Sequence, residues 1–350
     1  MHQLTSFIRQ SKVVLFDKFH IHFLAFLILL STPAHSTEPL VRWLDIEDVP
    51  LFDATILFPG RVVTDLQGNV ISVIIPLKRA GRLLLLEAII DGQIGTFILD
   101  TGSTSLVLNQ TYFRNYMPIN EIEASGITGS TGATHRVRVM RLQLSGMVFE
   151  NLYADVTNLS HIENRRGVQV FGLFGINLIK DMEIVVDVRN NELQLHRLDK
   201  TGNRLKPPSD KIVYDITGRV DANRNMVYVQ VEIGEKMLEF CLDTGAESNV
   251  LDIGLPKKVL NTVTILRRSS LQGAGSDSKE VLYGNMNDFS ISGKKIGNMQ
   301  VILTDLSGLS QKYGYSINGM LGYDFFEKGR IYINLTKHEL GIILNREVKP

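Results

Sequence analysis

The chain contains few of the residues that would indicate several common classes of protein. It has one cysteine, Cys241, in 350 residues, so neither an intrachain disulfide nor a cysteine-rich zinc site can form. Its 37 Lys and Arg residues balance 37 Asp and Glu residues, which argues against a broad basic surface for nucleic acid. No phosphate-binding glycine-rich loop, Gly-x-Ser-x-Gly turn or His-x-x-x-His pair occurs. We therefore expect no cofactor, no metal and no nucleic acid as partners.

The chain also has few long apolar runs. The most prominent one, Ile21–Leu30, lies near the N-terminus and follows a basic segment. Ala34 and Ser36 follow it as small residues two positions apart, which is typical of a signal-peptidase site. We predict a signal peptide over residues 1–36, with an uncleaved membrane anchor as the alternative, although a membrane span takes about 20 residues. Export without disulfides favours a bacterial periplasm, or else secretion.

The rest of the chain has an ordinary globular composition, with 44% apolar and 21% charged residues. Short β-branched and apolar runs such as Leu83–Ile90 and Val227–Ile233 are typical of strands. Asp91-Gly92 is a favoured hairpin turn. Helical patterns are sparse, and only residues 177–180 and 323–327 indicate short helices. The sequence predicts an all-β fold.

The chain also repeats itself. Residues 97–108 read FILDTGSTSLVL, and residues 240–251 read FCLDTGAESNVL, which places Asp100 and Asp243 143 residues apart (243 − 100). A second pair, FGLFGINLI at 171–179 and NGMLGYDFF at 318–326, has an offset of 147 (322 − 175). Two nearly equal offsets indicate a duplicated domain.

Each repeat places a carboxylate directly after an apolar strand, where burial disfavours the charged form. If the two domains face each other across a pseudo-two-fold axis, Asp100 and Asp243 meet. Two carboxylates in contact share one proton, because both cannot ionise cheaply. The charged member can then deprotonate a water while the protonated member donates to a carbonyl oxygen, which is general acid–base hydrolysis of an amide.

These motifs resemble those of the retropepsin-like aspartic peptidases, here as two copies in tandem. The resemblance covers about residues 75–199 and 220–346 and implies two β-barrel lobes related by a pseudo-two-fold axis, with a peptide-binding cleft between them. It implies catalytic roles for Asp100 and Asp243. It further implies that the active-site loops are supported by Thr101, Gly102, Ser103, Thr244, Gly245 and Ala246.

The predicted organisation has five segments. A signal peptide (1–36) is followed by an N-terminal extension (37–72), which either packs on the first lobe or forms a propeptide. The first peptidase lobe covers 73–199, a linker rich in proline and lysine covers 200–211, and the second lobe covers 212–346.

The family also has a glycine-rich hairpin flap over the cleft, and glycine-rich tips suit a mobile lid. A plain hairpin turn is the alternative. Neither candidate segment contains the flap tyrosine of pepsin-like enzymes, which favours the retropepsin-like branch. The candidate flap residues are Gly126, Gly129 and Gly132 in the first repeat and Gly273 and Gly275 in the second.

Two single positions give further expectations. Cys241 alternates with apolar neighbours and is interpreted as a small buried side chain. Ser103 follows Gly102 where the second repeat has Ala246, and its hydroxyl is expected to donate to Asp100 and favour the ionised form of that carboxyl. Asp243 is then the expected holder of the shared proton.

The sequence thus predicts an exported aspartic endopeptidase that acts on peptide or protein substrates. Because both halves contain an Asp-Thr-Gly triplet, one chain should form the complete site as a monomer. The alternative is a catalytically silent peptide-binding module on the same fold, and the two intact triplets argue against it.

Overall fold

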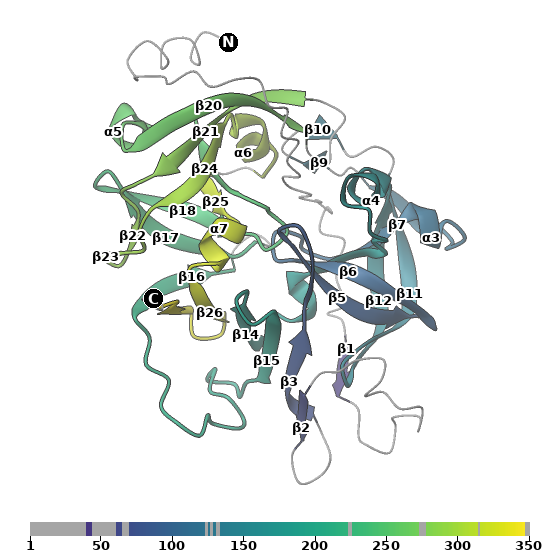
Figure 1. Cartoon of the computed structure of the whole chain (residues 1–350). Coiled ribbons are helices and arrows are strands. Elements are labelled where there is room, and N and C mark those ends of the chain that lie inside the picture. Colours follow the sequence, from purple (N-terminus) through teal and green to yellow (C-terminus); the bar gives the residue numbers. More distant parts are fainter. Residues whose placement is uncertain are drawn as a thin grey trace.

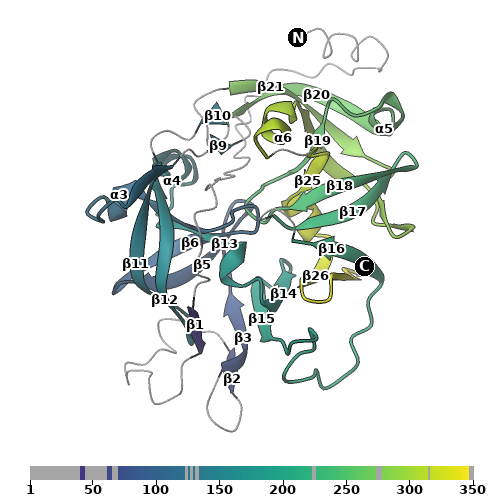
Figure 2. The ribbon, with the colours of Figure 1, turned by 180° about the vertical axis from the view of Figure 1, so that it is seen from behind.

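The computed structural model describes residues 40–43, 61–64, 70–122, 125–126, 129–130, 134–222, 226–272, 278–313 and 316–346. Figure 1 shows two β-rich lobes side by side, with strands from both parts of the chain beneath them, and Figure 2 shows the same arrangement from behind. This confirms the predicted all-β fold of two lobes.

The first lobe is a closed barrel of six strands. Its strands are neighbours in the order β12, β7, β13, β6, β5 and β11, and β11 pairs with β12 to close the circle. Asp91 (φ 45°) and Gly92 (φ 85°) form the predicted tight turn between β5 and β6. The barrel strands are β5 (Leu83–Ile90), β6 (Gln93–Asp100), β7 (Leu106–Asn109), β11 (Thr134–Leu144), β12 (Met147–Thr157) and β13 (Gly172–Gly175).

Shorter elements decorate this barrel. They are β1 (Leu40–Trp43), β4 (Lys78–Ala80), β8 (Asn120–Ile122), β9 (Ser125–Gly126), β10 (Gly129–Ser130), α3 (Gln110–Phe113), α4 (Ser160–Arg166) and the 3-10 helix Ile176–Leu178.

The second lobe repeats the central part of this arrangement, with strand order β17, β18, β25, β19, β24, β21 and β20. Its strands are β17 (Tyr228–Ile233), β18 (Lys236–Leu242), β19 (Asn249–Asp252), β20 (Val263–Gln272), β21 (Ser278–Met286), β22 (Ser290–Ile291), β23 (Lys294–Lys295), β24 (Met299–Thr304) and β25 (Gly319–Leu321). Its helices are α5 (Lys257–Leu260), α6 (Ser307–Tyr313) and α7 (Tyr323–Phe326).

A shared sheet joins the two lobes. Strand β14, which follows the first lobe, pairs antiparallel with β26 of the second, placing Ile184 opposite Ile333. The neighbouring strands extend this sheet on both sides in the order β2, β3, β15, β14, β26, β27 and β16. They are β2 (Arg61–Thr64), β3 (Val70–Pro76), β14 (Met182–Asp187), β15 (Glu192–Arg197), β16 (Ile216–Asp221), β26 (Gly329–Asn334) and β27 (Glu339–Leu344).

The apolar side chains form one large cluster and two smaller ones. The large cluster fills both lobes and the shared sheet. One smaller cluster, in the second lobe, includes Cys241, which is fully buried as predicted. The other lies in the first lobe around Ile98. Because Ile98 and Cys241 each stand two residues before an Asp-Thr-Gly aspartate, the smaller clusters flank the two aspartates.

The N-terminal predictions fall largely outside the described residues. The predicted signal peptide, residues 1–36, lies there entirely. Within 37–69, only β1 and β2 are described, and they pair with β12 and β3. None of the helices in the described ranges has the length and apolar content needed to cross a membrane.

Candidate active site

Each Asp-Thr-Gly loop begins where a buried strand ends. Asp100 is the last residue of β6, and β13 lies between β6 and β7, with Gly175 beside Asp100. In the second lobe, β25 lies between β18 and β19 in the same way. A Cβ on Gly175 would lie 2.2 Å from the Ser105 carbonyl oxygen, and one on Gly322 would lie 2.6 Å from that of Ala246. The repeated glycines therefore let a strand pack directly behind each loop.

The two aspartates meet at the boundary between the lobes. Each carboxyl lies against the glycine of the opposite loop, so that a Cβ on Gly102 would be 2.5 Å from the Asp243 Cγ. A Cβ on Gly245 would be 2.7 Å from the Asp100 Cγ. Each carboxyl perturbs the pKa of the other, and both are almost completely buried. The structure thus brings together the residues that the duplication placed 143 positions apart.

Reciprocal hydrogen bonds between the threonines connect the two loops. The Thr101 amide donates to the Thr244 hydroxyl oxygen at 3.0 Å, and the Thr244 amide donates to that of Thr101 at 3.0 Å. The Thr101 hydroxyl donates to the Leu242 carbonyl oxygen and the Thr244 hydroxyl to that of Leu99, both at 2.8 Å. All four bonds cross between the lobes and are buried, so they hold the aspartates in register.

Burial raises the pKa of both aspartates. For Asp100, burial is reinforced by the Asp243 charge, and its pKa lies well above the ordinary value. For Asp243, burial raises the pKa to about 6, while the Asp100 hydrogen bond and backbone amides, including that of Gly245 at 2.8 Å, oppose this rise. The pair therefore holds one shared proton well above the ordinary aspartate range.

The expected role of Ser103 is wrong. Its hydroxyl donates to the Ser105 carbonyl oxygen at 3.2 Å and not to the Asp100 carboxyl. Asp100 accepts from the backbone amides of Gly102 and Ser103 instead, at 2.9 and 3.0 Å. Backbone amides are present whatever the side chain, so the serine-to-alanine difference between the repeats does not place the proton on Asp243, and that assignment falls with it.

The flap predictions are described only in part. Gly126 in β9 pairs with Gly129 in β10, which makes a short hairpin between β8 and β11. Gly132 lies outside the described residues, as do Gly273 and Gly275 between β20 and β21. Those two strands form a long hairpin that pairs up to Gln272 and Ser278. The role of these segments as lids stays a prediction.

The short helices α4 and α6 form a third repeated element, which was not among those predicted from the sequence. Both begin after an Asx residue whose side-chain oxygen accepts from the serine two positions later: Asn158 from Ser160 at 2.9 Å, and Asp305 from Ser307 at 2.8 Å. Leu159 and Leu306, at the same offset of 147 (306 − 159), pack into the two small apolar clusters that flank the aspartates. The repeated Asx-Leu-Ser triplet was the available signal.

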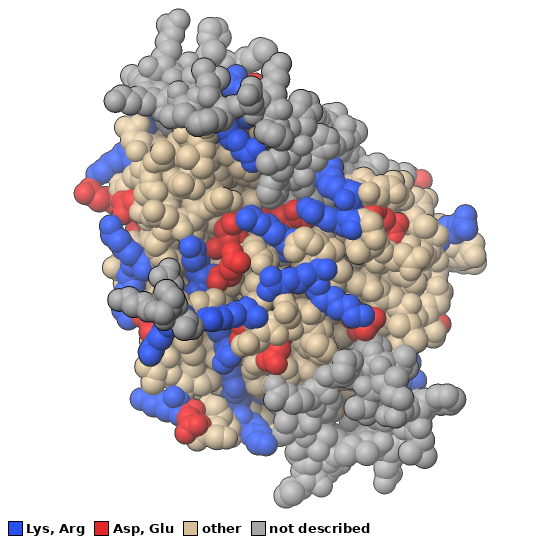
Figure 3. All heavy atoms as spheres, in the orientation of Figure 1, with Lys and Arg blue, Asp and Glu red and all other residues tan. Residues whose placement is uncertain are grey.

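Charges of both signs are interleaved across the middle of the face in Figure 3. Within the ranges that the structure describes, no group of three or more His, Cys, Asp and Glu side chains is arranged to hold a metal ion.

Two β lobes that each contribute an Asp-Thr-Gly loop to one buried carboxyl pair are the arrangement of an aspartic peptidase. The family model described as aspartyl protease matches residues 86–178 and 229–325, which together make up more than half of the chain. The chain belongs to this aspartyl protease family, with two family domains in tandem. No curated protein sequence gives a significant match.

Proposed function

We propose that the protein is an exported aspartic endopeptidase in which Asp100 and Asp243 are the catalytic residues. The observation that carries this proposal is the mutual packing of the two loops, in which each carboxyl lies against the opposite glycine and the threonines are cross-bonded. A silent peptide-binding module would not need the two carboxyls in contact, because their burial is costly.

The proposed reaction uses the two carboxyls in different protonation states. The ionised Asp243 takes a proton from a water molecule, whose oxygen attacks the carbonyl carbon of the scissile peptide bond. Asp100 donates its proton to the carbonyl oxygen, giving a tetrahedral diol. Asp243 then returns its proton to the amide nitrogen as the C–N bond breaks, and Asp100 recovers a proton from the diol.

The substrate is proposed to be an extended peptide lying between the lobes, with alternate side chains entering pockets on the two sides. The apolar residues that precede Asp100 and Asp243 in the sequence are the basis for expecting apolar side chains next to the scissile bond. Export follows from the basic and apolar N-terminal pattern alone.

Digestion of a peptide library across pH tests this function. The raised pKa values predict that activity is lost in acid once the second carboxyl is protonated, near pH 6, because no carboxylate then remains to activate water. We expect kcat/KM to fall below about pH 6 and to be highest in mildly acidic to near-neutral solution. No cleavage at any pH, with intact peptide binding, would support the silent module instead.

A single chain should contain the complete site. Specific activity is therefore expected to stay constant when the protein is diluted over about three decades of concentration, whereas an obligate dimer would lose activity as it dissociates. Progress curves at a fixed substrate concentration, alongside sedimentation of the same samples, measure this. A steep loss on dilution would contradict the monomeric site.

A further inference from the structure

A buried carboxyl other than the catalytic pair lies at the lobe boundary. Glu247 comes four residues after Asp243, and its side chain is 1% exposed. It forms an ion pair with Arg166, the last residue of α4 in the other lobe. Burial raises the pKa of Glu247 to about 7, opposed by Arg166, Arg165 and Arg82. A group buried at this cost requires its partner, because a buried charge left unpaired is strongly destabilising.

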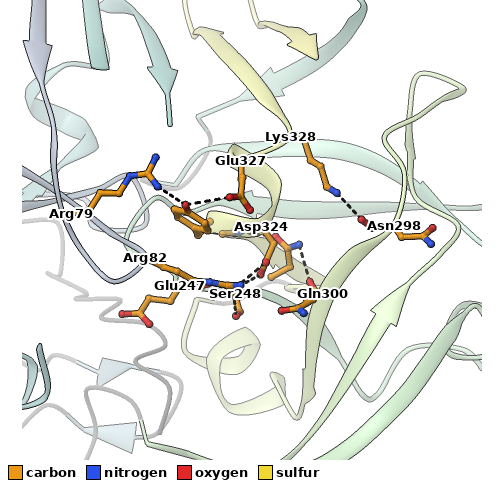
Figure 4. Close-up of polar contacts among 12 residues, drawn as sticks. Arg79, Arg82, Glu247, Ser248, Asn298, Gln300, Asp324, Glu327 and Lys328 are labelled. Carbon is orange, nitrogen blue, oxygen red and sulfur yellow. Dashed lines mark hydrogen bonds and ion pairs between the residues drawn. The ribbon is translucent and has the colours of Figure 1, made fainter. Parts of the chain in front are cut away.

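The Arg166 guanidinium also lies against a second segment of its own lobe. A Cβ on Gly81 would lie 2.7 Å from the Arg166 Nη1, and Gly81 has a φ of +65° that favours glycine. The next residue, Arg82, donates to the Glu247 carbonyl oxygen at 3.0 Å and forms an ion pair with Asp324 at 3.0 Å. Figure 4 shows Arg82 reaching Ser248 and Asp324 beside Glu247. The turn between β4 and β5 and the end of α4 therefore both contact the loop that follows Asp243.

Helix α4 also packs beside the strand that ends at Asp100. Its Ile162, with the preceding Leu159, packs in the apolar cluster that contains Ile98 and Val107. Because Ile98 stands two residues before Asp100 on the same strand, this cluster lies on the face of β6 toward which Asp100 points. Helix α4 therefore packs against the apolar cluster that flanks Asp100.

The first repeat has no acidic residue at the position equivalent to Glu247. The repeat places Thr104 at the position of Glu247 (247 − 143), and threonine cannot form an ion pair. Helix α6 packs Leu306 and Leu309 in the equivalent cluster of the second lobe. The residue equivalent to Glu247, which would have to form an ion pair with α6, is the uncharged Thr104. The site is pseudo-symmetric in its aspartates and asymmetric in this contact.

We propose that the Arg166–Glu247 pair fixes α4 as a substrate-contacting wall on one side of the cleft, which makes both residues positioning residues that set peptide selectivity on that side of the scissile bond. The proposal rests on the proposed peptidase function. It adds that the side of the cleft formed by α4 is held rigid. It concerns substrate binding and not the proton transfers, which the aspartates perform.

The test uses the full chain with Arg166→Met, Glu247→Gln and the double variant. Each single change is expected to raise KM about tenfold with kcat within about threefold, and the double variant should be no worse than either single one, since the three lose the same contact. Arg166→Lys should recover part of the loss. Lys258→Met, which breaks an exposed pair with Glu235 far from the cleft, is the matched control and should leave both constants unchanged.

Cleavage-site profiling with a peptide library gives the decisive readout. Selectivity should broaden on one side of the scissile bond and stay unchanged on the other. Equal broadening on both sides, a fall in kcat at constant KM, or additive effects in the double variant would overturn the proposal.

Hydrogen exchange separates this inference from the proposed function, because it needs no activity. In Glu247→Gln the α4 amides should exchange faster while the α6 amides stay unchanged. Equally faster amide exchange in α4 and α6 would overturn the proposed role of the Arg166–Glu247 pair even if the protein is an active enzyme. If the wild type cleaves no peptide but Glu247→Gln shows this exchange pattern, the role of the Arg166–Glu247 pair is supported and the peptidase function is contradicted.

Discussion

Asp100→Asn and Asp243→Asn are each expected to lower kcat by at least about 10³-fold. An amide can neither accept a proton from water as a carboxylate does nor deliver one as a carboxylic acid does, so either change leaves a single working carboxyl. The measurement is the initial rate of cleavage of one library-derived peptide at the pH of highest wild-type activity.

Folding is the necessary control for this pair of variants. Replacing one buried carboxyl by an isosteric amide removes the cost of burying its charge, so the melting temperature should be unchanged or higher. Near wild-type turnover in a folded Asp243→Asn protein would rule out the shared-proton mechanism. A loss of activity accompanied by unfolding in both variants would leave the carboxyls with a structural role and contradict the proposal equally.

Gly102→Ala and Gly245→Ala are expected to reduce activity by about 10²-fold or more. The added methyl group would lie 2.5 Å from the Asp243 Cγ in one case and 2.7 Å from the Asp100 Cγ in the other, well inside van der Waals contact. Neither glycine has a positive φ, so the backbone itself tolerates alanine and the whole effect comes from displacement of the opposite carboxyl. A displacement of about 1 Å is enough to cost about 10²-fold in rate.

Gly308→Ala is the matched control for these substitutions. A Cβ at Gly308, in α6, meets no heavy atom within 4 Å, and alanine favours a helix over glycine by up to about 1 kcal/mol. Its activity should equal that of the wild type and its melting temperature should not fall. If Gly102→Ala and Gly308→Ala had the same activity, the close approach of the two loops would be wrong.

Several features were determined by local sequence and were predicted correctly. Asp91-Gly92 turns because glycine and aspartate tolerate positive φ. The strands before Asp100 and Asp243 follow from apolar and β-branched runs, and Cys241 is buried because it alternates within such a run. The short helix at Tyr323–Phe326 lies within the predicted 323–327. The earlier one, Ile176–Leu178, is a 3-10 turn that overlaps 177–180.

The expected role of Ser103 was wrong because it depends on the direction of the hydroxyl within the folded loop. The side chain of Ser103 could be compared with Ala246 from the sequence, but the direction of its hydroxyl is set by the Ser105 carbonyl oxygen, which the folded loop brings near. The balance between Asp100 and Asp243 then depends on backbone amides and on the contact of the carboxyls with each other.

The sequence by itself determined that the chain is duplicated and strand-rich, with one Asp-Thr-Gly carboxyl in each half, because a repeat and its periodicity are written in residue order. Only the tertiary structure decided which groups meet across the lobes. Arg166 and Glu247 lie 81 positions apart in segments without a shared pattern, and an ion pair leaves no periodic trace in a single sequence. The ion pair needs Arg166 from one copy and Glu247 from the other, so neither copy encodes the contact alone.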